Sequence, residues 1–65
     1  MQIIVNGETA TIDEMSVLDY LGLLSIDPQR VAVELNLDIL PKTDYVTTLL
    51  KEGDSLEIVH FVGGG

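Results

Sequence analysis

The chain has 65 residues, a formal net charge of −8 and 46% hydrophobic residues. This length leaves room for one domain, and the apolar content is too high for a disordered chain. Only three residues are Lys or Arg, which argues against nucleic acid and anionic membranes as partners, because both are bound by clustered cations. An acidic surface suits a basic protein partner, but it also serves solubility alone.

The sequence contains no cysteine, and therefore no disulfide framework, thiolate metal site or thiol nucleophile. The first seven residues lack the basic and long apolar regions of a signal peptide. No apolar run approaches the roughly 20 residues that cross a membrane. We therefore expect a cytoplasmic protein with a single domain over residues 1–65.

The first twelve residues predict a β-hairpin. Ile3 and Val5 fall on one face of the expected first strand. Asn6-Gly7 is a strong signal for a tight turn, because both central residues of a type I′ turn need a positive φ. A second strand is expected over residues 8–12, where two threonines favour the extended conformation.

A helix is expected to begin after Ser16. This serine is a good N-cap, and Asp19 three residues later makes a weak capping box. The apolar residues that follow recur at helical spacing, namely Val17, Leu18, Tyr20, Leu21 and Leu24. The helix is expected to end near Ser25, because Asp27-Pro28 disfavours the α region. Gly22 costs this helix about 1 kcal/mol relative to Ala, and it either lets the helix lie close to a strand or is simply tolerated.

The middle of the chain predicts a third strand and a short fourth one. The third covers residues 31–36, with its valines on one face. Leu37-Asp38 is expected to form a turn, and Ile39-Leu40 a stub of strand that Pro41 ends, since proline suits an edge. Residues 43–45 are expected to form a single helical turn, with Tyr45 against the core and its hydroxyl at the rim.

A last strand follows a tight turn at residues 52–54, and residues 46–50 form a short strand or an extended connection before it. The resulting order is ββαβ(β)β, which predicts an α+β fold: a mixed sheet of four to five strands with one main helix across one face. The first and last strands are the most apolar. We expect them side by side in the middle of the sheet, which makes that pair parallel.

Alternation along the last strand decides which of its side chains lie in the core. Glu57 cannot enter the core unpaired without a large cost, so Leu56 and Ile58 are expected to face the helix. Val59 and Phe61 then lie on the open face, with Ile4 and Ala32 nearby on the same face. Exposed apolar side chains of this kind often mark a partner site. Alternatively, Val59 and Phe61 pack on each other and on Ile4.

Val62, Gly63, Gly64 and Gly65 close the sequence, and we expect residues 62–65 to form a flexible tail. Fully extended, such a tail reaches about 13 Å. Three glycines without β-carbons fit a channel that any side chain would block. One interpretation is that the tail carries its terminal carboxylate to another enzyme, and the other is a frayed end without a role.

The residues form no constellation of catalytic groups. His60 is the only histidine and has neither further ligands nor a nucleophile beside it, so we expect it to be structural. The eleven carboxylates form no recognisable spaced pair, and the terminal glycines do not open a helix as a phosphate-binding loop does. We therefore expect neither an enzyme nor a protein with a bound metal or cofactor.

Several segments together resemble the ThiS family, the ubiquitin-like sulfur carriers of thiamine biosynthesis. They are Val5-Asn6-Gly7, Val31-Ala32-Val33-Glu34-Leu35-Asn36, Pro41-Lys42 with Tyr45, Glu52-Gly53-Asp54, and Glu57-Ile58-Val59-His60-Phe61-Val62-Gly63-Gly64-Gly65. The resemblance spans essentially the whole chain, is most specific at its end, and implies a β-grasp fold. Two positions depart from the family pattern: Leu37-Asp38 stands where a glycine is usual, and Lys42 where arginine is frequent.

The resemblance implies a carrier that is not itself an enzyme. A ThiF-type adenylating enzyme would use ATP and Mg²⁺ to activate the C-terminal carboxylate, here that of Gly65. A sulfur-delivering persulfide protein would convert the adenylate to a thiocarboxylate, and thiazole synthase (ThiG) would take the sulfur into the thiazole ring. Gly63 and Gly64 would thread the active site of the partner. The partner-binding patch would comprise Ile4, Val59, Phe61 and Val62.

Two other functions stay open from the sequence. A MoaD-like carrier for molybdopterin synthase would have the same fold and tail chemistry with a different acceptor, although such carriers are generally longer. A non-covalent ubiquitin-like interaction module would use the same surface and leave the terminus idle.

Overall fold

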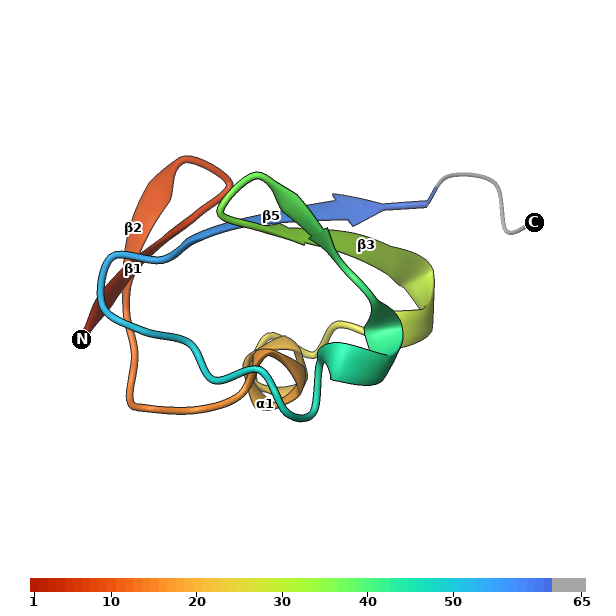
Figure 1. Cartoon of the computed structure of the whole chain (residues 1–65), viewed down its shortest axis with the longest axis horizontal. Helices are drawn as coiled ribbons and strands as arrows, with labels where there is room; N and C mark the ends of the chain where they lie inside the picture. The colour runs from red at the N-terminus through yellow and green to blue at the C-terminus, as the bar shows by residue number, and fades with distance from the viewer. Residues whose placement is uncertain (62–65) are drawn as a thin grey trace.

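The computed structural model describes residues 1–61, and at its centre is a five-stranded sheet with the order β2-β1-β5-β3-β4 (Figure 1). The strands are β1 (Gln2–Val5), β2 (Glu8–Thr11), β3 (Val31–Leu35), β4 (Asp38–Leu40) and β5 (Ser55–His60). β5 runs parallel to β1 on one side and antiparallel to β3 on the other. The mixed sheet and the parallel pairing of the first and last strands are therefore confirmed.

The β1–β2 hairpin turns at the two residues that predict it. Asn6 has a φ of 50° and Gly7 a φ of 83°, as a type I′ turn requires. This turn pairs Val5 with Glu8 and places Ile3, which is fully buried, on the core side.

The helix α1 (Val17–Leu23) begins where its cap predicts. The Ser16 side chain accepts a hydrogen bond from the backbone N–H of Asp19, at 3.0 Å. Val17, Tyr20 and Leu21 are buried against the sheet, while Leu24, expected on the same face, is 43% exposed. A β-carbon built at Gly22 would meet no atom within 4 Å, so this glycine is tolerated and mediates no close approach to a strand.

The helix ends two residues earlier than the expected end near Ser25. The N–H of Ile26 donates to the carbonyl of Leu21, and the N–H of Ser25 donates to the carbonyl of Gly22. Ser25 has a φ of 59°. These features make a Schellman motif with serine in the position that glycine usually takes, so the helix ends through its own cap before Asp27-Pro28 is reached.

The turn between β3 and β4 lies one residue earlier than predicted. Its central residues are Asn36 and Leu37, with φ values of 52° and 74°. Asp38 therefore belongs to β4, paired with Leu35. Leucine rarely adopts a positive φ, so this turn carries no sequence signature, and the two-residue connection is set by the register of the strands.

Two single turns of 3₁₀ helix complete the chain, η1 (Pro28–Arg30) and η2 (Lys42–Asp44). The expected helical turn near Tyr45 is confirmed, shifted by one residue, and η1 was not predicted. Tyr45 is only 2% exposed, so its expected position against the core is confirmed.

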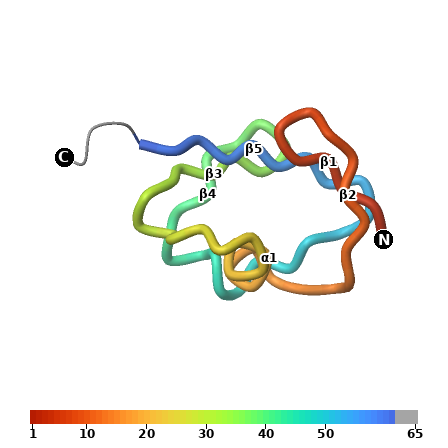
Figure 2. Tube along the Cα trace, turned by 180° about the vertical axis from the view of Figure 1, so that it is seen from behind, coloured from red at the N-terminus to blue at the C-terminus, as the bar shows by residue number. Residues whose placement is uncertain are grey.

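The elements form two layers in both views (Figures 1 and 2). α1 and the segment that connects β4 to β5 lie on one side of the sheet, where the buried side chains form one cluster. Within residues 1–61, no element covers the other face of the sheet. No helix in this part of the chain is long and apolar enough to cross a membrane.

Candidate functional site

The candidate site is the far end of β5, because the glycine segment begins three residues after that strand ends in the sequence. Leu56 is fully buried and Ile58 is 6% exposed, so the predicted core face of the strand is confirmed. The backbone of β5 is hydrogen-bonded to β3 from Leu56 to His60 and to β1 near its start. The root of the glycine segment is thus the central strand of the sheet.

The side chain of Asn6 adds a second attachment on the β1 side of β5. Its Oδ1 accepts a hydrogen bond of 2.7 Å from the N–H of Ile58, and its Nδ2 donates one of 3.2 Å to the carbonyl of the same residue. The backbone of β1 has already turned away here, so the asparagine amide takes the place of a peptide group and extends the parallel ladder by one step.

The side chain of Asn36 makes a similar attachment on the β3 side, at the beginning of β5. Its Oδ1 accepts a hydrogen bond of 2.9 Å from the N–H of Ser55, and its Nδ2 donates one of 3.0 Å to Oδ1 of Asp54. The sequence identified Asn6 as a turn residue and did not predict either side chain's bond to β5. The only available signal was an asparagine at each hairpin tip.

The uncovered face of the sheet carries separated apolar side chains. Val59 is 54% exposed, with half-buried Ala32 directly opposite on β3. Ile4 is 41% exposed and lies on the same face, next to Ser55. It is therefore about 13 Å along the strand from Val59, which rules out packing of the two on each other.

Two carboxylates and one further apolar residue lie between and beside these positions. Glu57 and Glu34 are directly opposite each other on β5 and β3, an arrangement of like charges that disfavours the pairing of the strands. Glu34 also pairs with Ile39 of β4, which is 79% exposed. Ile39 thus belongs to this face, although the sequence indicated only a strand stub. We call this surface, formed by Ile4, Ile39 and Val59 around Glu34 and Glu57, the open face.

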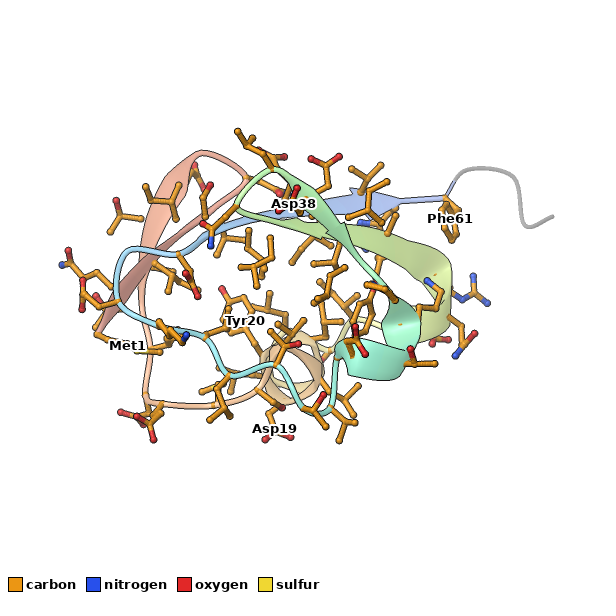
Figure 3. All side chains as sticks on the ribbon, viewed as in Figure 1. Met1, Asp19, Tyr20, Asp38 and Phe61 are labelled. Carbon is orange, nitrogen blue, oxygen red and sulfur yellow. The ribbon has the colours of Figure 1, made fainter. Side chains whose placement is uncertain are left out.

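Phe61 departs from the open face, so the expectation that it lies beside Val59 is wrong. β5 ends at His60, and the Phe61 ring lies on the η2 side of the strand (Figure 3). Its ring centroid is 5.3 Å from Nζ of Lys42, and the ring remains 59% exposed. Alternation beyond the last paired residue therefore did not predict the direction of this side chain.

Lys42 lies at this end of β5, and the sequence did not mark it as functional. Its Nζ donates a hydrogen bond to the carbonyl of Val31 and lies 5.8 Å from the ring centroid of Tyr45. Burial raises the pKa of the Tyr45 hydroxyl, and a hydrogen bond from the backbone of Val33 opposes this rise.

The predicted site residues Val62, Gly63, Gly64 and Gly65 lie outside the described residues. Their roles as tail, partner contact and reacting carboxylate therefore remain predictions. Among residues 1–61, no three His, Cys, Asp or Glu side chains gather closely enough to hold a metal ion. His60 is exposed at the end of β5.

Comparison with protein families finds one match over nearly the whole sequence. The model of the ThiS family matches residues 3–65, a range that includes the glycine segment. The chain is 35% identical to the thiamine biosynthesis protein (ThiS) from Geobacter metallireducens, whose crystal structure superimposes with a TM-score of 0.86 over 100% of both chains.

Curated proteins give two kinds of relative. The sulfur carrier protein ThiS of Bacillus subtilis is 40% identical over 53 residues, which cover 82% of this chain and 80% of the relative. A thiazole synthase of Paramagnetospirillum magneticum is 46% identical over 66 residues, which cover 100% of this chain and 20% of the relative. The chain thus spans about a fifth of the length of that thiazole synthase and of a second one from Magnetococcus marinus.

Proposed function

The chain belongs to the ThiS family, and on this premise we propose that it is a sulfur carrier for the formation of the thiazole ring of thiamine. The observation that carries the proposal is the position of β5. A central strand, bonded on both sides and by two asparagines, is followed in the sequence by Phe61, Val62 and three consecutive glycines. This arrangement gives a slender carrier segment a rigid base.

The sulfur would be held at the carboxylate of Gly65. Because the sequence has no cysteine, it has no thiol on which to carry sulfur, and an activated acyl group is the remaining means. A carboxylate is unreactive until one oxygen becomes part of a good leaving group. In the proposed first reaction, a ThiF-type enzyme binds ATP and Mg²⁺. The carboxylate attacks the α-phosphate of ATP, and pyrophosphate leaves.

A persulfide protein then supplies the sulfur. Its terminal sulfur attacks the acyl carbon of the adenylate and displaces AMP, which gives an acyl disulfide. A thiol then breaks the S–S bond of this acyl disulfide. The thiocarboxylate stays on Gly65, and the thiol is oxidised to a disulfide with the persulfide protein. Thiazole synthase would take the sulfur from this thiocarboxylate. The described residues of the carrier supply no acid, base or metal to these steps, so we propose that the catalysts are its partners.

Intact-mass spectrometry of the 65-residue chain tests this proposal. After incubation with a ThiF-type enzyme, ATP, Mg²⁺ and a persulfide donor, the chain should gain about 16 Da, the replacement of one oxygen by sulfur. A chain that lacks Gly64 and Gly65 should keep its circular dichroism spectrum and gain nothing. If the full chain also gains nothing with an enzyme that converts another ThiS protein, the carrier function is refuted and a non-covalent module is favoured.

We propose that the open face docks the carrier on thiazole synthase and on the activating enzyme. Val59 is its central apolar side chain, and the two glutamates beside it suit a partner surface with a basic residue. Val59→Ala should weaken binding to thiazole synthase by about 1–2 kcal/mol in a calorimetric titration. Leu23→Ala is the matched control, because Leu23 is 65% exposed on α1, in the other layer. Equal affinities for the two variants would exclude the open face as the docking surface.

A further inference from the structure

The contacts of Lys42 at the end of β5 have no role in the proposed chemistry. The Lys42 ammonium group donates a hydrogen bond to the carbonyl of Val31 and lies 5.3 Å from the ring centroid of Phe61. Phe61 is the residue from which residues 62–65 continue. Figure 3 shows its ring turned from the strand toward the side of η2, where Lys42 begins that turn.

The end of β4 explains why an ammonium group is needed at this place. β4 ends at Leu40, and Pro41 has no N–H to donate. If the register of β3 with β4 continued, Lys42 would lie opposite Val31. The chain instead turns into η2, and the side chain of Lys42 reaches back to the carbonyl that a further residue of β4 would have satisfied.

Phe61 is held at two points, neither of which is apolar burial. Its N–H donates a hydrogen bond of 2.9 Å to the carbonyl of Arg30, and its ring faces the ammonium group of Lys42. The ring is 59% exposed, so packing alone does not fix it. A main-chain bond thus holds the backbone of the residue, and the ammonium group lies over its ring.

We propose that Lys42 is a positioning residue that holds Phe61 and thereby sets the direction in which residues 62–65 leave the domain toward the activating enzyme. The functional half of this proposal rests on the proposed sulfur-carrier function. The structural half states that the ammonium group orders Phe61, and it does not rest on that function. The two halves are therefore tested separately, the first measurement on the carrier alone and the second with its activating enzyme.

The first measurement is amide hydrogen exchange at Phe61, followed by NMR. Lys42→Met keeps the unbranched side chain and removes the charge, and exchange at Phe61 should become about three- to tenfold faster. Lys42→Arg should restore the slow rate. Lys51→Met is the matched control: this exposed lysine precedes the start of β5, at the opposite end of the strand, and its loss should leave the rate unchanged. Unchanged exchange in Lys42→Met would overturn the proposal.

A second variant keeps the test decisive if Lys42→Met does not fold. Phe61→Leu retains apolar bulk and the hydrogen bond of Lys42 to Val31 but removes the aromatic face. It should accelerate exchange at position 61 by a similar factor. Where both single variants fold, adding the second change to the first should have little further effect, because the contact is already lost. Independent, multiplying effects would show that the two side chains are not coupled, and the proposal would fail.

The second measurement is the rate at which the activating enzyme and persulfide donor produce the thiocarboxylate, as a function of carrier concentration. A misdirected tail leaves docking through the open face intact, so Lys42→Met should lower kcat about three- to tenfold with KM unchanged, and Lys42→Arg should restore it. A raised KM with normal kcat would instead make Lys42 a docking contact and refute positioning. If even the wild-type chain gains no sulfur, the proposed function fails, while exchange at Phe61 still decides whether Lys42 orders that residue.

Discussion

Replacement of Asn6 by glycine removes the two hydrogen bonds that join its side chain to Ile58 while keeping a residue that accepts a positive φ. The bonds measure 2.7 Å and 3.2 Å and are partly buried. At about 1 kcal/mol each, their loss costs about 2 kcal/mol. The greater freedom of glycine in the unfolded chain costs about 0.5–1 kcal/mol, and relief of the positive φ offsets this cost. We therefore expect Asn6→Gly to lower the free energy of unfolding by about 2 kcal/mol.

Chemical denaturation with urea, followed by circular dichroism, measures this loss. For a domain of this size, about 2 kcal/mol corresponds to a fall in Tm on the order of 10–15 °C. Amide exchange gives the local readout: the N–H of Ile58 should exchange faster in Asn6→Gly even under conditions in which the domain stays folded.

Asn36→Gly is the matched control within the same chain. Asn36 has nearly the same φ, 52° against 50°, and also makes two side-chain bonds to the β5 region. Both of its bonds are exposed, so water replaces them, and we expect a loss of only about 0.5–1 kcal/mol. If the two variants lose the same stability, the attachment of Asn6 to β5 has no special energetic role and the reasoning is refuted.

Three further changes test the helix and the core by the same denaturation assay. Gly22→Ala should raise the free energy of unfolding by about 1 kcal/mol, because the helix position is open to a methyl group; a loss would reveal a hidden steric constraint. Ser25→Gly should add about 0.5 kcal/mol by relieving a non-glycine residue at a φ of 59°, and no gain would mean that the serine is unstrained there. Tyr45→Phe should cost about 1 kcal/mol at neutral pH through the lost hydrogen bond from the backbone of Val33. Because burial raises the pKa of Tyr45 in the folded state, the advantage of the wild type should be complete below about pH 10 and vanish as the pH rises through the folded-state pKa. A constant difference across that range would show that folding does not raise the pKa of Tyr45.

The fold was predictable where local chemistry and the global arrangement agree. Asn6-Gly7 accepts the positive φ values of its turn, and Ser16 caps α1 as its residue type predicts. The charge of Glu57 fixed the core face of the last strand, which put Leu56 and Ile58 against the helix. In each case one residue type strongly excludes the alternative conformation.

Prediction failed where a residue acts through a distant partner or against its own preference. Leu37 takes a φ of 74° because strand register imposes it, and no property of leucine signals that turn. The bonds of Asn6 to Ile58 join residues 52 apart in the sequence. Lys42 appeared only as a departure from the family's arginine, and its contact with Phe61 requires the geometry at the end of β4.

His60, the last residue of β5, and Phe61, which follows it, are held differently from the buried part of that strand. Leu56 and Ile58 are fixed by burial, whereas His60 and Phe61 are exposed and depend on hydrogen bonds and on the charge of Lys42. Contacts of this kind contribute about 1 kcal/mol each to the free energy of unfolding, whereas a buried side chain contributes several kcal/mol. Changes at Lys42 should therefore leave global stability nearly intact and alter the presentation of the glycine segment. Changes at Asn6, which acts on the buried part of the strand, should appear first in stability.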